Sequence, residues 1–325
     1  MTTIRKSRAL LFAALLAANG VLGQTSRFII DDDEFLEQVT RGSGRLAKDH
    51  KLLTTVALRE QVRTCSRTYQ IPTAPISQEK LAPPELYERL RESTLAIGTY
   101  FKCKACPDWH FNASSGFVVA NGIVSTCCHV VTAEEPDAKE AYLVAADSSG
   151  RVFPVQSVLA ADQDADTCFV RVDTAGLKPL PLRAQARPGE KVFCLSHPGG
   201  YHFMFTEGIV ARLNRQRNAA YDSNGKTNGM LSRPVLFLNI TAEFAPGSSG
   251  APVVDDAGNV LGQVASITDA GDPGSEEEHV PPSPSVPIRY CTATEEILRL
   301  MSPAVTDLHN PRTVTRKKNE VRHSK

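Results

Sequence analysis

Residues 243–266 read EFAPGSSGAPVVDDAGNVLGQVAS, with two adjacent serines between glycines just ahead of an apolar run. Gly-Ser-Ser-Gly alone is common as a turn, because glycine and serine are frequent in loops. The continuation is more specific, since two apolar runs flank the turn residues DDAGN, as in a pair of antiparallel strands. The stretch therefore predicts a turn that leads into a β-hairpin, and it raises the question of whether Ser248 or Ser249 is a nucleophile.

The same layout recurs from about residue 95 to residue 292. In SGFVVANGIVST, Asn121 and Gly122 separate two apolar runs, the strongest short-range signal of a hairpin, and AYLVAADSSGRVFPV repeats the pattern. Many short strands with Gly, Asn and Asp turns predict an all-β fold, an antiparallel sandwich or barrel rather than a parallel sheet. Residues 176–190 lack periodicity and contain three prolines, so we expect them to connect two β halves of similar size.

The N-terminal part of the chain differs from this β region. Residues 1–23 carry basic residues and then an apolar Ala-Leu run that ends on small residues, which is typical of a signal peptide. An uncleaved membrane anchor is the alternative. Residues 24–84 have helical spacing followed by a Pro-bearing linker, and they predict a helical or loosely ordered extension. We therefore expect an exported protein, periplasmic or secreted, whose main domain spans residues 85–302.

The C-terminal part contains three further segments. Residues 267–288 predict an acidic, proline-rich insertion, residues 292–301 a closing amphipathic helix, and residues 303–325 a basic flexible tail. The whole chain balances 36 Lys and Arg against 36 Asp and Glu, so charge gives no indication of a nucleic-acid partner. No stretch after the signal is apolar enough to predict a membrane span. The oligomeric state does not follow from the sequence.

Eight cysteines stand at positions 65, 103, 106, 127, 128, 168, 194 and 291. In an oxidising compartment an even number permits disulfides, although spacing does not determine their pairing. Cys103-Lys-Ala-Cys106 followed by His110, and the vicinal Cys127-Cys128, could also indicate zinc. We favour disulfides or buried thiols, and we expect neither a metal nor a cofactor.

A serine becomes a nucleophile when a histidine takes its proton and an acid orients that histidine. His129 directly follows the second strand of the Asn-Gly hairpin, among apolar residues, where it would be rigid and partly buried. Asp166 directly precedes the apolar run TCFVRV, so its carboxylate would lie against the core and need a partner. Asp162 and Asp164 are farther from that run and are interpreted as turn residues.

Four segments together resemble the successive motifs of trypsin-like serine peptidases, in particular the HtrA/Deg branch. They are STCCHVV, DQDADTCFVRV, KVFCLSHPGGYHFMFTEGIVARL and APGSSGAPVVDDAGNVLG, and the resemblance covers about residues 95–300. It implies two antiparallel six-stranded β-barrels, at about 95–178 and 186–292. A PDZ domain of the HtrA type is not expected after residue 301.

The resemblance also implies the site residues. The family's histidine and aspartate fall on His129 and Asp166, and its Gly-x-Ser-Gly motif selects Ser249 as nucleophile, in one of the known triad orders. The oxyanion hole falls on the backbone N–H groups of Gly247 and Ser249. Ser248 occupies a position that is aspartate in trypsin, so we expect it to shape the loop.

Protein or peptide substrates would lie extended along the strand at 264–267, against Val264, Ala265 and Ser266. The pocket for the side chain before the cut would involve Glu243, Phe244 and Ala245. Glutamate favours a basic substrate residue there, whereas phenylalanine and alanine favour a small or apolar one, and both alternatives remain open.

Two other functions compete with a serine endopeptidase that forms an acyl-enzyme. An α/β-hydrolase would need glycine at position 251, where this chain has alanine, and its acid and histidine after the serine. A latent trypsin-like scaffold that only binds proteins or peptides is the stronger alternative, since fold does not determine function. The sequence favours the peptidase because all three triad positions and Gly247 are present.

Overall fold

The computed structural model describes residues 28–174, 176–217, 219–221, 227–230, 232–270 and 286–301. The predicted signal peptide (1–23), the C-terminal tail (303–325) and most of the acidic insertion (267–288) lie outside these ranges. Within them, no helix is long and apolar enough to cross a membrane.

The first barrel is built from six strands that close in the order β1-β2-β3-β6-β5-β4, all pairs antiparallel. The strands are β1 (Thr94–Cys103), β2 (Trp109–Ala120), β3 (Ile123–Thr126), β4 (Ala138–Ala146), β5 (Val152–Asp162) and β6 (Thr167–Val172). The Asn121-Gly122 turn joins β2 to β3, with Gly122 at a φ of 74°. The hairpin that this dipeptide predicted is confirmed.

The second barrel closes in the order β11-β14-β13-β12-β7-β8. Its strands are β7 (Lys191–Ser196), β8 (Met204–Gln216), β11 (Val235–Ile240), β12 (Pro252–Val254), β13 (Val260–Ala270) and β14 (Val286–Ala293). A separate two-stranded sheet pairs β9 (Ala219–Tyr221) with β10 (Thr227–Met230). Two antiparallel six-stranded barrels, the trypsin-like arrangement expected from the sequence, are therefore confirmed.

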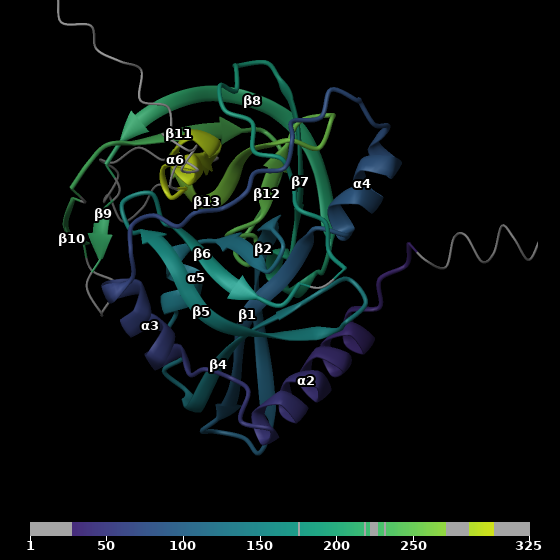
Figure 1. Ribbon diagram of the computed structural model, residues 1–325, viewed down its shortest axis with the longest axis vertical. Coiled ribbons are helices and arrows are strands. Elements are labelled where there is room, and N and C mark those ends of the chain that lie inside the picture. The colour runs from purple at the N-terminus through teal and green to yellow at the C-terminus, as the bar shows by residue number, and fades with distance from the viewer. Residues whose placement is uncertain are drawn as a thin grey trace, which may run out of the picture.

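Strand β1 shows how alternation in the sequence serves two cores. Leu95 and Ile97 point into the first barrel with Val118 and Val170, while Ala96 and Tyr100 face a cluster that also contains residues of the second barrel. Because both faces are covered, the first eight residues of β1 are buried. The two barrels thus share a packed interface, which Figure 1 shows with the second barrel above the first.

Among the residues that the structure describes, three helices precede the first strand: α2 (Asp32–Lys48), α3 (Thr55–Thr64) and α4 (Pro83–Arg91). In Figure 1, α2 and α3 flank the first barrel and α4 lies beside β7. Helix α2 runs through Gly42, which normally weakens a helix, but a Cβ there would lie 2.6 Å from Val152 Cγ2. Gly42 therefore allows α2 to pack closely against β5. A last helix, α6 (Thr294–Arg299), follows β14.

Candidate active site

His129 and Asp166 lie together where the short helix α5 (Cys128–Thr132) meets the turn before β6. His129 Nδ1 is 2.6 Å from Asp166 Oδ2, and the His129 backbone N–H donates to Asp166 Oδ1 at 2.9 Å. Because the carboxylate holds both the ring and the backbone of one residue, the imidazole has a fixed orientation. Asp166 accepts at Nδ1, so this nitrogen carries the proton and Nε2 is the free basic atom.

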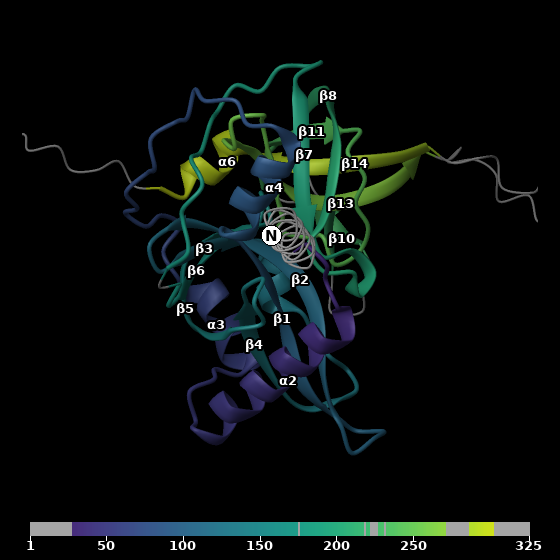
Figure 2. The same ribbon diagram turned by 90° about the vertical axis from the view of Figure 1, so that its right-hand side faces the viewer.

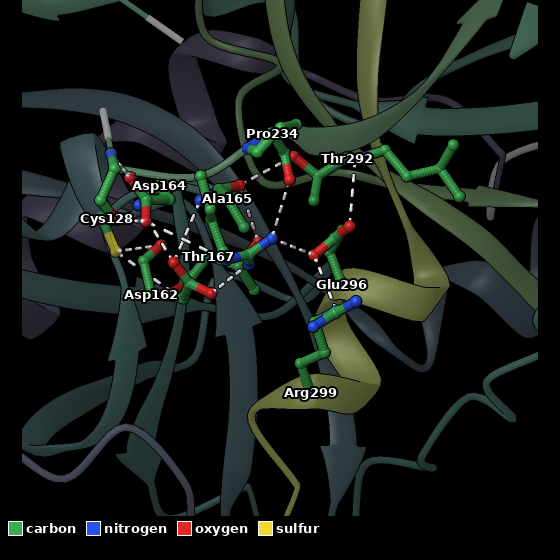
Figure 3. Close-up of polar contacts among 12 residues, drawn as sticks. Cys128, Asp162, Asp164, Ala165, Thr167, Pro234, Thr292, Glu296 and Arg299 are labelled. Carbon is green, nitrogen blue, oxygen red and sulfur yellow. Dashed lines mark hydrogen bonds and ion pairs between the residues drawn. The ribbon is translucent and has the colours of Figure 1, made fainter. Parts of the chain in front are cut away.

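The backbone of Asp166 is held in an unusual conformation. Its φ is 50°, in the left-handed region that few non-glycine residues adopt. Neighbouring atoms fix the turn on both sides: Thr292 Oγ1 donates to Ala165 O at 2.9 Å, and Cys128 Sγ donates to Thr167 O at 3.2 Å. These contacts at Ala165 and Thr167, shown in Figure 3, hold the turn that carries the Asp166 carboxylate.

A buried ionic network supports the same turn from the second barrel. Arg233, just before β11, makes ion pairs with Asp162 at the end of β5 and with Glu296 of α6, the latter at 2.7 Å. Asp164 accepts from the backbone N–H of Ser232 at 2.7 Å. Asp162 caps its own turn by accepting from the N–H of Asp164, as expected of a turn residue. Nothing in the sequence indicated that both acids also join the two barrels (Figure 3).

The Ser248-Ser249 turn is attached to the first barrel through Ser115 of β2. The Ser115 N–H donates to Ser249 O at 2.9 Å, and Ser115 Oγ donates to Gly247 O at 3.1 Å. Gly247 has a φ of 96°, and a Cβ there would lie 2.5 Å from His197 O. Only glycine fits this position, so the segment is a fixed turn rather than a flexible joint.

The two serines differ in environment. Ser248 is fully buried, and its Oγ donates to Ser196 Oγ at 3.0 Å. Ser249 is partly exposed, and no hydrogen bond joins its Oγ to another residue in the part of the chain that the structure describes. Only Ser249 therefore presents a hydroxyl that a substrate could reach.

The Val264 carbonyl of β13 connects the serine turn to the histidine segment. It accepts from the N–H of Gly250, the residue after Ser249, at 2.8 Å. It also accepts from Cys127 Sγ, two residues before His129, at 3.2 Å. One backbone oxygen thus brings together segments that are more than a hundred residues apart in the sequence.

Two backbone N–H groups of the serine turn stay available. The N–H groups of Ser248, Gly250 and Ala251 all donate to backbone carbonyls. Those of Gly247 and Ser249 have no acceptor among the described residues. Donors left unpaired on a rigid turn are what an oxyanion hole requires.

The residues predicted to bind substrate differ in their exposure to solvent. The side chain of Glu243 is 82% exposed and 3.6 Å from Arg289, Ala245 is exposed, and Phe244 is buried. On β13, Val264 and Ala265 are buried, Ser266 is exposed, and the pairing with β14 shifts register between Val264 and Ser266. Such a bulge leaves one residue unpaired next to the serine turn.

The charge state of His129 depends on two opposing effects. Burial lowers its pKa, whereas the charge and the hydrogen bond of Asp166 raise it, and the net result is a pKa above the usual 6.5. The His129 side chain is still 51% exposed, so solvent moderates both effects. The Asp166 carboxylate nevertheless favours the protonated imidazole. This suits a general base, which becomes a cation when it takes a proton.

A metal could be considered at this site, because ligand atoms of Cys127, His129 and Asp166 lie within 4.8 Å of one another. Burial raises the pKa of Cys127 well above its usual value, and the negative charge of Asp166 raises it further. The thiol therefore stays protonated and is a poor ligand. All eight cysteines are free thiols in the structure.

A pocket of about 390 Å³ adjoins Gly247, and α2 forms one of its walls. Asp32, Asp33 and Leu36 of this helix face Pro246 and Gly247 across the pocket. The sequence predicts α2 as part of the N-terminal extension (24–84) but does not determine whether that extension is a propeptide, an oligomerisation arm or a spacer.

Asp32 also binds the loop that supports Gly247. The His202 backbone N–H donates to Asp32 Oδ1 at 2.9 Å, and His202 Nδ1 lies 2.9 Å from the same oxygen. The Gly199 N–H of this loop donates to Pro246 O at 2.8 Å. The N-terminal helix is therefore connected to the serine turn through a short chain of contacts.

Comparison with known proteins gives a family model and several proteases to which this chain is similar. Residues 114–262 match the family model of the trypsin-like peptidase domain. The chloroplastic Protease Do-like 1 of Arabidopsis thaliana is 30% identical over 110 residues, covering 32% of this chain and 23% of that protein. Serine protease HTRA1 of Xenopus tropicalis is 28% identical over 154 residues, covering 46% of this chain and 30% of that protein. Putative serine protease HhoA of Synechocystis is 29% identical over 153 residues, covering 46% of this chain and 35% of that protein. The chain thus spans about a quarter to a third of these relatives.

Among solved structures, the active form of the Rv3671c protease from M. tuberculosis is 23% identical, with a TM-score of 0.47 over 71% of this chain and 88% of that one. The chain therefore has two trypsin-like barrels, matches the trypsin-like peptidase domain over residues 114–262, and is similar to serine proteases of the HtrA type.

Proposed function

We propose that this chain is a serine endopeptidase in which His129, Asp166 and Ser249 form the catalytic triad. The observation that carries the proposal is that Asp166 contacts His129 twice. Its Oδ2 is 2.6 Å from His129 Nδ1, and its Oδ1 accepts from the His129 backbone N–H at 2.9 Å. This arrangement leaves Nε2 as the base, while the Val264 carbonyl links its segment to that of Ser249. The trypsin-like relatives support the same assignment.

The reaction would begin when Ser249 Oγ attacks the substrate carbonyl and His129 Nε2 takes its proton. Asp166 stabilises the imidazolium that forms. The tetrahedral oxyanion would accept from the N–H groups of Gly247 and Ser249, and losing one such donor costs about 2.7–4 kcal/mol in the barrier. His129 then protonates the leaving amine, and water hydrolyses the resulting acyl-enzyme with His129 again as base.

Substrate would bind as an extended strand beside Val264, Ala265 and Ser266, where the bulge frees backbone groups for pairing. Glu243 would select the side chain before the cut. Its carboxylate is largely exposed and only loosely paired with Arg289, which favours a basic substrate residue. Phe244 is buried, so it would form the floor of the pocket rather than its opening.

We further propose that the substrates are exported proteins or peptides, because residues 1–23 resemble a signal peptide. The test of export is N-terminal sequencing of the protein recovered from the culture or periplasm. A mature N-terminus near residue 24 would support the proposal, and an intact Met1 in the cytoplasm would contradict it.

The test of the triad is labelling with a fluorophosphonate probe, which phosphonylates an activated serine with loss of fluoride. We expect one adduct, on Ser249, that is lost in Ser249→Ala and His129→Ala and retained in Ser248→Ala. Turnover of a peptide substrate should fall by about 10⁴ or more when either triad residue is removed.

Other outcomes would reject parts of the proposal. No adduct on the folded wild-type protein would favour the latent, peptide-binding scaffold. An adduct on Ser248 would show that the nucleophile is misassigned. A cleavage profile on a peptide library would test the pocket, because Glu243→Gln should abolish a preference for Lys or Arg before the cut.

A further inference from the structure

The loop between β1 and β2 gathers three metal-ligand side chains away from the triad. Cys103 ends β1, Cys106 lies in the connecting loop, and His110 is the second residue of β2. One ligand atom from each lies within 4.8 Å of the other two, and Cys106 Sγ is 3.1 Å from His110 Nε2. In Figure 2, β1 and β2 extend downward, away from the second barrel.

The hairpin fixes these residues before any ion is bound. His110 pairs with Phe101 across the two strands, and their rings lie 5.4 Å apart. The Cys103 N–H donates to Asp108 O at 3.2 Å, which closes the loop. The three ligands are therefore presented by a defined backbone, and each is partly exposed, so an ion could enter.

The loop also favours the metal-binding form of sulfur. The Ala105 N–H donates to Cys103 Sγ at 3.3 Å, a contact that stabilises a thiolate. The ammonium groups of Lys102 and Lys104 bind the carbonyls of Pro107 and Pro136, so both flanking cations are occupied with backbone oxygens. Cys103 and Cys106 are free thiols and do not form a disulfide with each other.

The distances match zinc. Zn–S bonds of about 2.3 Å and Zn–N bonds of about 2.0–2.1 Å in a tetrahedron place two sulfurs about 3.8 Å apart and a sulfur and a nitrogen about 3.5 Å apart. The Cys106 Sγ–His110 Nε2 distance is 3.1 Å and no two of the ligand atoms are more than 4.8 Å apart, so each separation is within about 1.3 Å of its value in this geometry. Two thiolates and one imidazole are also ligands that zinc prefers over the hard cations Mg²⁺ and Ca²⁺.

We propose that Cys103, Cys106 and His110 bind one Zn²⁺, with a water molecule as the fourth ligand. Two thiol protons would be released on binding, and the two thiolates would balance the charge of the ion. The residues that directly follow His110 in β2, Phe111 to Ala113, line the pocket beside Gly247. The ion would therefore stabilise one wall of that pocket, independently of whether the proposed peptidase function is correct.

The experiment is a Co²⁺ titration of the full chain after treatment with a chelator under a thiol-free reductant. We expect one Co²⁺ per chain, with visible d–d bands and a near-ultraviolet sulfur-to-cobalt charge-transfer band, both removed by Zn²⁺. Cys106→Ser and His110→Gln should each weaken binding by more than about 100-fold, because losing an outer-shell partner alone costs about 10–100-fold.

Cys65→Ser is the matched control, because Cys65 is also a partly exposed free thiol and lies outside the cluster. This variant should keep the wild-type spectrum and affinity. The proposal is overturned if no charge-transfer band appears, if Cys65→Ser removes the band while Cys106→Ser does not, or if mass spectrometry of untreated protein finds a Cys103–Cys106 disulfide.

Discussion

Replacing Arg233 by methionine should destabilise the protein by removing the cation from a buried acidic network. The Glu296 side chain is only 1% exposed, and its Oε2 lies 2.7 Å from Arg233 Nη1. Removing one partner of a buried ion pair costs about 3–5 kcal/mol, because the other charge is left without compensation. Methionine fills the space of the aliphatic stem but offers no donor.

The lower end of that range applies here. Without Arg233, Glu296 would still accept a hydrogen bond from the Leu236 N–H at 3.0 Å and pair with the exposed Arg299 at 3.2 Å. The Arg233 side chain is also 25% exposed. We therefore expect a loss of about 3 kcal/mol in the free energy of unfolding. In a domain of this size that corresponds to a decrease of about 6–12 °C in Tm.

Urea unfolding followed by fluorescence, with Tm by calorimetry, measures the loss. The control is a double-mutant cycle with Glu296→Gln, which removes the buried charge. Arg233→Met should then cost less in the Glu296→Gln background, with a coupling of at least about 1 kcal/mol. Strict additivity, or a loss below about 1 kcal/mol for Arg233→Met alone, would refute the reasoning.

The remaining predictions concern His129 and Asp32, in catalysis and in stability. The net effect of burial and of Asp166 raises the pKa of His129, so kcat/KM should rise with pH through a midpoint above 6.5, and a midpoint at or below 6.5 would contradict the assigned partner. Because the folded-state pKa is the higher one, the same pair stabilises the fold fully below about pH 6.5 and loses this contribution as pH rises through the folded value. Asp32→Ala should lower stability by about 1 kcal/mol and reduce kcat by loosening the loop at His202, whereas Asp33→Ala, in the same turn of α2, should not. Equal effects of the two substitutions in unfolding and turnover assays would show that helix-terminal charge, rather than the contact with His202, is responsible.

The barrels could be predicted from the sequence because their signals are local. The strand TCFVRV coincides with β6 (Thr167–Val172), and the Asn121-Gly122 turn is found between β2 and β3. His129 was expected directly after one apolar run and Asp166 directly before another, and the structure brings His129 Nδ1 and Asp166 Oδ2 to 2.6 Å. Turn chemistry and alternation act over a few residues, so they are visible without the fold.

Contacts between distant segments could not be predicted. Asp162 and Asp164 were interpreted only as turn residues, and the structure adds Arg233 as a partner from the second barrel. Asp32 binds His202, 170 positions away. An exposed acid in a turn or at a helix start has the same local pattern whether or not a distant cation or N–H reaches it, so only the three-dimensional packing distinguishes the two cases.

The pocket beside Gly247 has a consequence for inhibitor design. Its wall from α2 consists of Asp32, Asp33 and Leu36, which lie outside residues 114–262, the stretch matched to the peptidase family. A compound that reacts with Ser249, the proposed nucleophile, and carries a cationic arm into this pocket would draw its potency from the serine turn, which lies inside the matched stretch. Its selectivity would come from a helix that the family match does not include.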